Sequence, residues 1–191
     1  GHLNDLCLIS PIFYKGRVIA IAANQAHHVD MGGFAPGSMP FGVTEIFQEG
    51  LQIPPVRLFH KGELHRELWA LISQNVRPRT EVRGDLMAQF AANNVGARRL
   101  GDLVTRHGVG TVGVYLDEML NYSERRMRAA IGTIPRGSYS FEDVIEGDGI
   151  TDERFTIRLT LEAKGDSVRA DFSATEDASL GPLNCRWPSV A

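Results

Sequence analysis

The stretch that decides the start of the fold is Leu6-Cys7-Leu8-Ile9-Ser10-Pro11-Ile12-Phe13-Tyr14-Lys15-Gly16-Arg17-Val18-Ile19-Ala20-Ile21-Ala22-Ala23. Residues 6–14 and 18–23 are rich in β-branched and other apolar side chains, and a short loop that contains glycine separates them. This pattern is typical of two antiparallel strands joined by a tight turn. We therefore predict an N-terminal β-hairpin.

Polar residues flank both outer ends of this hairpin. The first strand is preceded by His2-Leu3-Asn4-Asp5, and the second is followed by Asn24-Gln25-Ala26-His27-His28-Val29-Asp30-Met31-Gly32-Gly33. The outer ends of an antiparallel pair are neighbours in space. We therefore expect His2 and Asp5 to lie close to His27, just past the end of the second strand.

Imidazole and carboxylate groups are the common ligands of zinc, manganese and iron, so this arrangement is compatible with a metal site. Adjacent side chains on a strand point to opposite faces, so at most one of His27 and His28 would share a ligand with Asp5. The other could orient it or simply pack. From spacing alone, a metal site and a hydrogen-bonded polar turn explain these residues equally well.

Standard short metal motifs are absent from the sequence. It contains no His-Glu-x-x-His, and its two cysteines, Cys7 and Cys185, stand far apart. A closed, cysteine-rich structural zinc site is therefore excluded.

Beyond the hairpin, the sequence changes from a loop to helices and then to strands. Residues 31–55 are rich in glycine and proline and predict a long loop with one helical turn at 44–49. The patterns that follow predict a short strand at 56–60, helices at 63–76, 80–107 and 111–134, and strands at 139–145, 155–162 and 168–173.

The sequence thus predicts an α+β fold, with an N-terminal β-hairpin and metal-site loop, a central pair of long helices and a C-terminal antiparallel β-meander. We divide it into a metal-site hairpin and loop region at 1–78, a helical region at 79–135, the meander at 136–178 and a truncated tail at 179–191. Asn93 and Asn94 within the first long helix are assigned to a solvated face, unless that face meets a partner.

The run Gly108-Val109-Gly110-Thr111-Val112-Gly113 has the glycine spacing of a dinucleotide fingerprint. That fingerprint needs a buried strand before it, whereas a helix precedes this run. The sequence also contains no Gly-Lys pair, which removes a Walker A phosphate loop. We expect no nucleotide site in this chain.

Composition narrows the class of protein. The net charge of -3 argues against a nucleic-acid-binding surface, and no apolar run has the length of a membrane span. Two distant cysteines give no disulfide framework, so a reducing, cytoplasmic setting is expected. The chain begins without methionine inside the polar motif, and we expect it to be a fragment of a longer polypeptide, inactive by itself.

Several motifs, in this order, resemble those of the hydantoinase B/oxoprolinase family over essentially the whole chain. They are the 24–33 motif quoted above, Pro36-Gly37-Ser38-Met39-Pro40, Glu45-Ile46-Phe47-Gln48-Glu49-Gly50, residues 53–56, 84–86 with 91–93, 96–100 and 122–128, and Gly181-Pro182-Leu183-Asn184-Cys185.

The resemblance implies the metal-dependent part of an ATP-dependent enzyme that opens cyclic amides such as 5-oxoproline or hydantoins. ATP would be used by a separate A-type ATPase subunit or domain, in a hetero-oligomer, and not bound here. Two alternatives remain: the corresponding subunit of an acetone or acetophenone carboxylase, or a non-catalytic assembly module.

The resemblance also implies a set of site residues. His2, Asp5 and either His27 or His28 would hold a divalent zinc, manganese or iron ion. Asp30 would be a further ligand, or would orient an imidazole by hydrogen bonding. The catalytic group would comprise Asp5, His27, His28 and Asp30.

Overall fold

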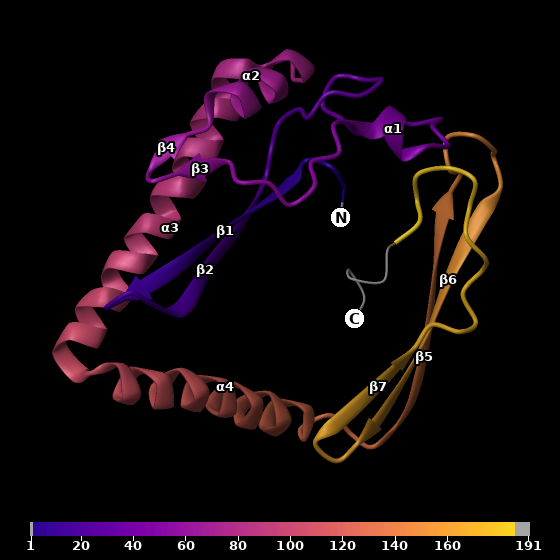
Figure 1. Cartoon of the computed structure of the whole chain (residues 1–191). Coiled ribbons are helices and arrows are strands. Elements are labelled where there is room, and N and C mark those ends of the chain that lie inside the picture. Colours follow the sequence, from indigo (N-terminus) through magenta and orange to yellow (C-terminus); the bar gives the residue numbers. More distant parts are fainter. Residues whose placement is uncertain (1, 186–191) are drawn as a thin grey trace. The chain divides into compact units, whose positions relative to one another are not determined.

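The computed structural model describes residues 2–185 (Figure 1). These residues form two compact units, one containing 2–101 with 184–185 and the other Asp102–Leu183. The paired strands are all antiparallel and, apart from the short α1, are grouped in sequence separately from the helices, which confirms the α+β class. The boundary between the units lies inside a long helix, whereas the four predicted regions followed changes in secondary structure. Of the predicted tail 179–191, residues 186–191 lie outside the described residues.

The first unit begins with the predicted hairpin, made of β1 (Asp5–Tyr14) and β2 (Arg17–His27). Lys15 and Gly16 form its turn with φ of 48° and 76°, the left-handed conformation that two-residue hairpins require. β2 continues through His27 and does not end at Ala23, because residues 24–27 pair with the first residues of β1. Asp5 consequently lies directly opposite His27.

The long loop after β2 contains α1 (Ile46–Glu49), close to the predicted helical turn. The strand predicted at 56–60 is reduced to β3 (Phe59–His60), which pairs with β4 (Glu63–Leu64). Lys61 and Gly62 turn between them with φ of 51° and 87°. The prediction was too long because the partner strand is only two residues long.

Two helices complete the first unit: α2 (Arg66–Asn75) and most of α3 (Arg79–His107). α2 starts later than predicted, since residues 63–64 belong to β4 and the ring of His65 caps the helix by accepting a bond from Leu68 N at 3.3 Å. The buried core joins the loop to these helices through Met31, Ile72, Val76, Val82 and Leu86.

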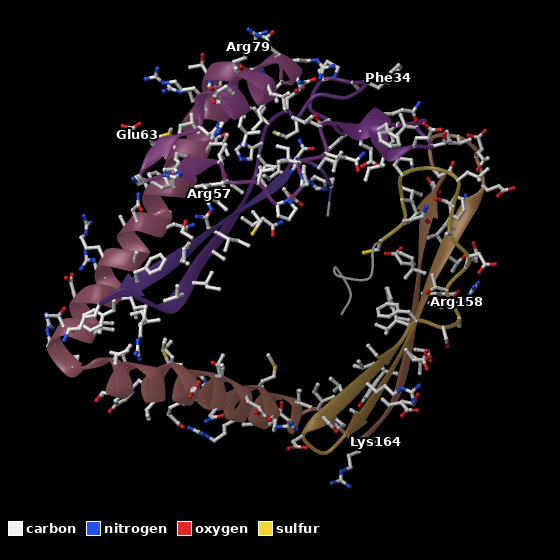
Figure 2. All side chains as sticks on the ribbon, viewed as in Figure 1. Phe34, Arg57, Glu63, Arg79, Arg158 and Lys164 are labelled. Atoms are coloured by element: carbon white, nitrogen blue, oxygen red, sulfur yellow. The ribbon has the colours of Figure 1, made fainter. Side chains whose placement is uncertain are left out.

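The second unit contains α4 (Val109–Ile131) and the strands β5 (Gly137–Glu146), β6 (Arg154–Lys164) and β7 (Ser167–Asp171). The strands form the predicted antiparallel meander in the order β5-β6-β7. Figure 2 shows Lys164, at the end of β6, pointing away from this sheet.

The glycine run at 108–113 lies at a junction between helices. Gly108, with φ of 84°, follows α3 and precedes α4, which contains Gly110 and Gly113. The run therefore lacks the strand that a dinucleotide fingerprint needs. Within the described part of the chain, no helix has both the length and the apolar character needed to cross a bilayer.

Candidate metal centre

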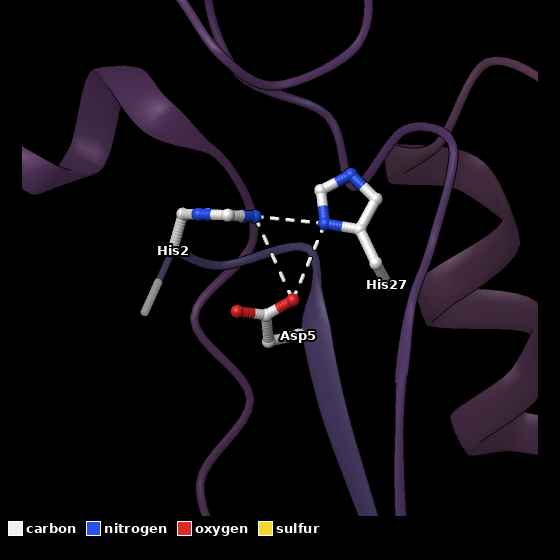
Figure 3. Close-up of side chains that lie close together, drawn as sticks. All are labelled: His2, Asp5 and His27. Carbon is white, nitrogen blue, oxygen red and sulfur yellow. Dashed lines mark hydrogen bonds and ion pairs between the residues drawn. The ribbon is translucent and has the colours of Figure 1, made fainter. Parts of the chain in front are cut away.

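Three side chains converge at the open end of the hairpin (Figure 3). Asp5 N donates a hydrogen bond of 3.1 Å to the carbonyl of His2, and this turn brings His2 Nε2 to 3.6 Å from Asp5 Oδ1. The strand pairing brings His27 Nδ1 to 3.2 Å from the same oxygen and to 2.7 Å from His2 Nε2. Each residue offers one ligand atom, and these atoms all lie within 4.8 Å of one another.

The chemistry of this cluster fits a divalent cation. The 2.7 Å between the two imidazole nitrogens is a hydrogen-bond distance, and because two facing lone pairs would repel each other, one ring donates an N–H to the other. A cation that bound both nitrogens would take the place of this hydrogen. A carboxylate oxygen beside them adds negative charge and makes the mixed nitrogen and oxygen set that zinc, manganese and iron accept. The side chains of Asp5, His2 and His27 are 20%, 38% and 50% exposed, so the cluster is reached from solvent.

His28 lies outside this cluster. It is completely buried, and its Nε2 is 3.0 Å from Oε1 of Gln89 on α3. Gln89 Nε2 donates to Leu6 O and to Asn24 Oδ1, so its Oε1 is the acceptor and His28 Nε2 carries the hydrogen. Of the two histidines that the sequence left as alternatives, His27 is therefore the one that lies beside Asp5.

Asp30 also lies outside the cluster and organises the loop that follows β2. Its carboxylate accepts bonds from the backbone N–H groups of Gly32, Gly37 and Arg77, and it forms an ion pair of 2.8 Å with the Arg77 guanidinium. Burial by itself raises the pKa of Asp30, but these donors outweigh it and hold that pKa below its ordinary value.

Backbone contacts of the same loop leave no room for a side chain at Gly33. A Cβ added there would lie 2.5 Å from the carbonyl carbon and oxygen of Glu49, and Gly33 has φ of +83°. The loop therefore packs closely against α1 at this point, and glycine is required for both conformation and space.

Two polar residues of α3 contact the hairpin. The sequence pattern placed Asn93 on a solvated face and gave Gln89 no role. Asn93 is 4% exposed, and its Nδ2 donates to Leu8 O and Ser10 Oγ. Gln89, one helical turn earlier, bonds His28, Leu6 and Asn24. Their spacing of four residues puts both amides on one helix face, which is the signal that could have identified them.

The fold and the cluster together define an α+β protein with a solvent-accessible group of two imidazoles and a carboxylate at the end of a β-hairpin. The profile of the hydantoinase B/oxoprolinase family matches residues 1–191. The chain belongs to the hydantoinase B/oxoprolinase family.

Relatives with known names support this assignment. The chain is 35% identical to the beta subunit of the caprolactamase of Pseudomonas jessenii, over 88% of this chain and 29% of that protein. It is 32% identical to one subunit of a putative D-/L-hydantoinase of a Pseudomonas species, over 92% of this chain and 30% of that protein. The chain therefore spans less than a third of the length of these two relatives.

Solved structures show the same fold. The ATP-dependent caprolactamase of Pseudomonas jessenii superposes with a TM-score of 0.78 at 34% identity, over 89% of this chain and 29% of the other. The nucleotide-free structure of acetone carboxylase superposes with a TM-score of 0.82 over 91% of this chain and 25% of the other. At 21% identity, this match supports a shared fold and nothing more.

Proposed function

We propose that this chain supplies the metal-binding part of an ATP-dependent hydrolase of cyclic amides. The observation that carries the proposal is the convergence of His2 Nε2, Asp5 Oδ1 and His27 Nδ1 within 4.8 Å. Membership of a family whose relatives include a caprolactamase subunit and a hydantoinase subunit supports the substrate class.

The three side chains would contribute to cation binding in different ways. His2 and His27 would each present a nitrogen lone pair, and Asp5 would offset part of the positive charge. Bound there, a zinc, manganese or iron ion supplies Lewis-acid chemistry and makes water more acidic. Because His27 is half exposed, the open side of the cluster leaves space for water and for the substrate carbonyl.

The requirement for ATP follows from the stability of the substrate. The amide of an unstrained ring is stabilised by resonance and reacts slowly with water. Transfer of the terminal phosphoryl group of ATP to the amide oxygen would release ADP and make the carbon electrophilic. Attack by water on that carbon would then break the C–N bond, which opens the ring, and release phosphate. We assign the phosphoryl transfer to an A-type ATPase partner in a cytoplasmic hetero-oligomer, and the attack of water to the site on this chain.

The test is a stoichiometric assay of the complete protein assembled with its ATPase partner. Hydantoins, 5-oxoproline and caprolactam are supplied in turn, and ADP and ring-opened product are measured together. We expect equal amounts of both with one of these substrates, and loss of product in the His27→Ala variant. ATP turnover without ring opening on every cyclic amide would overturn the proposal.

A ketone carboxylase subunit is the second candidate, favoured by 28% identity to the delta subunit of the acetophenone carboxylase of Aromatoleum aromaticum over 96% of this chain. Consumption of acetone or acetophenone that requires both bicarbonate and ATP would establish it in place of the hydrolase. A non-catalytic assembly module is the third, and it requires that loss of Asp5 or His27 prevent folding or assembly.

A further inference from the structure

We propose that Asn4 is the positioning residue of the metal site, because it fixes the segment carrying His2 and Asp5 against the segment carrying His27. This inference rests on the proposed function, since it concerns the geometry of the same three ligands. Asn4 lies between two of them in sequence, is completely buried and offers no atom to the cluster itself.

Asn4 extends the β-ladder by one step with its side chain. Asp5 and His27 are the last regular pair of the hairpin. At the next position, Asn4 O accepts a bond of 2.9 Å from His28 N, and Asn4 Nδ2 donates one of 2.8 Å to His28 O. The side-chain amide of Asn4 thus donates the hydrogen bond that a backbone N–H would donate in a regular strand pair. Because His28 is bonded in this way, the adjacent His27 is also held in place.

The second hydrogen of the same amide ties the cluster to the loop after β2. Asn4 Nδ2 donates a bond of 2.9 Å to Gly37 O, and the N–H of Gly37 donates to the Asp30 carboxylate. The loop fixed by Asp30 and Arg77 therefore supports Asn4 through Gly37. Through this chain of bonds, Asp30 acts on the site indirectly.

Asn4 joins the two segments through the two hydrogens of its side-chain amide. Asn4 Oδ1 is buried without a hydrogen-bond partner among the described residues, whereas both hydrogens of Nδ2 meet carbonyl oxygens. A side chain without donors would leave the carbonyls of His28 and Gly37 unpaired in a buried environment, which is unfavourable. The two ligand-bearing segments would then separate beyond the last strand pair.

Asn93 provides a matched control for this role. It is a buried asparagine that also donates from Nδ2 to a β1 carbonyl, Leu8 O, but it holds the middle of the hairpin to α3. Replacing either asparagine with alanine removes the same chemical groups. Only Asn4 contacts the segment that follows His27.

The experiment compares Asn4→Ala with Asn93→Ala in the complete protein. Zinc affinity is measured by competition with a chromophoric chelator, and the cobalt-substituted proteins are compared by absorption spectroscopy. Hydrogen exchange reports the protection of residues 2–6 and 24–30. We expect Asn4→Ala to weaken zinc binding at least about tenfold, to change the cobalt spectrum and to lose protection at His28, as is usual for residues that orient metal ligands. We expect Asn93→Ala to change the zinc affinity by less than about twofold, even if it lowers the melting temperature as much as Asn4→Ala does.

The outcomes separate the two proposals. Unchanged zinc affinity and protection in Asn4→Ala, or equal losses in both variants, would overturn the positioning role. If the wild-type protein binds none of zinc, manganese and iron, the proposed function fails, while the exchange data still show whether Asn4 fixes the two segments. Should Asn4→Ala not fold, Asn4→Asp is judged by the same criteria, because its added negative charge favours cation binding and any loss then reflects geometry.

Discussion

Two adjacent histidines have opposite environments in this protein. His27 is half exposed beside Asp5, whereas His28 is completely buried and bonds Gln89. Strand geometry alone sends neighbouring side chains to opposite faces, so one of them can reach the cluster and the other the core. Substitution of each should therefore have a different kind of effect.

We expect His27→Ala to remove the metal with little change in fold, and His28→Ala to reduce the free energy of unfolding by about 2 kcal/mol through loss of a buried hydrogen bond and of packing. Plasma mass spectrometry measures metal content, and urea unfolding without metal measures stability. In the wild type we expect near-stoichiometric zinc, manganese or iron. Retention of the metal in folded His27→Ala would contradict the ligand assignment.

At the same scale, Asp30 makes stability depend on pH. Its pKa is lowered from the ordinary value of 3.8 in the folded state, so its stabilising effect is complete above that value and is lost as pH falls through the lowered pKa. We expect Asp30→Asn to be about 2 kcal/mol less stable than the wild type at neutral pH, with a smaller difference as the pH falls through the lowered pKa.

Urea unfolding at a series of pH values measures this difference. Asp166→Asn is the matched control, since Asp166 is 63% exposed and forms only a surface ion pair of 3.5 Å with Arg128. Its substitution should change stability by less than about 0.5 kcal/mol. A constant difference between Asp30→Asn and the wild type across the series would show that the carboxylate charge is unimportant.

At the scale of elements, the hairpin is held to α3 by amide side chains. Asn24 Nδ2 donates to Gln89 O and to Asn93 Oδ1, and the side chains of Gln89 and Asn93 donate back to β1 carbonyls. These bonds satisfy polar groups at the edge of β1 and fix how the helix lies on the hairpin. Asn93 is thus a buried contact residue and the solvated face predicted for it was wrong, because the face does meet a partner element.

The loop after β2 depends on close packing against α1, and glycine substitutions test this. Gly33 and Gly16 have similar φ angles of +83° and +76°, but a Cβ at Gly16 meets nothing within 4 Å. We expect Gly16→Ala to cost about 1 kcal/mol from backbone strain alone. Gly33→Ala should cost more than about 3 kcal/mol, because its Cβ also meets the Glu49 backbone. Equal losses in thermal or urea unfolding would show that the loop yields easily.

At the scale of the whole molecule, large apolar surfaces stay exposed within the described residues. α4 has no buried residue, and Leu120 and Met119 on it are 72% and 64% exposed. In the meander, Phe141 is 70% exposed although its strand alternates as if one face were buried. Exposed apolar surfaces of this extent mark places where other protein surfaces bind.

We therefore expect the 191-residue chain, produced by itself, to bind a hydrophobic dye and to self-associate. Phe141→Ser should reduce dye fluorescence without changing the circular dichroism spectrum. Ser140→Ala, at the neighbouring position on the opposite face of β5, should leave the fluorescence unchanged. Light scattering and dye titration measure both effects, and a monomeric chain without dye binding would contradict the expectation.

The sequence by itself determined the elements that depend on local patterns. The hairpin turn at Lys15 and Gly16, the long helices and the alternation along β6 follow from the periodicity and the conformational preferences of neighbouring residues. The grouping of His2 and Asp5 with the histidine pair His27 and His28 followed from the antiparallel hairpin, because residues near its two outer ends are neighbours. The family resemblance added the chemistry.

Only the tertiary structure decided what joins distant segments. The choice of His27 over His28, the role of Asn4 and the amide bonds from α3 depend on strand register and on contacts between residues 24 to 85 positions apart. A hydrogen bond between such residues has no local signal, since an asparagine in a helix has the same sequence pattern whether it faces water or a strand. Packing brings the partners together, and burial then makes each unpaired donor or acceptor costly enough to fix the arrangement.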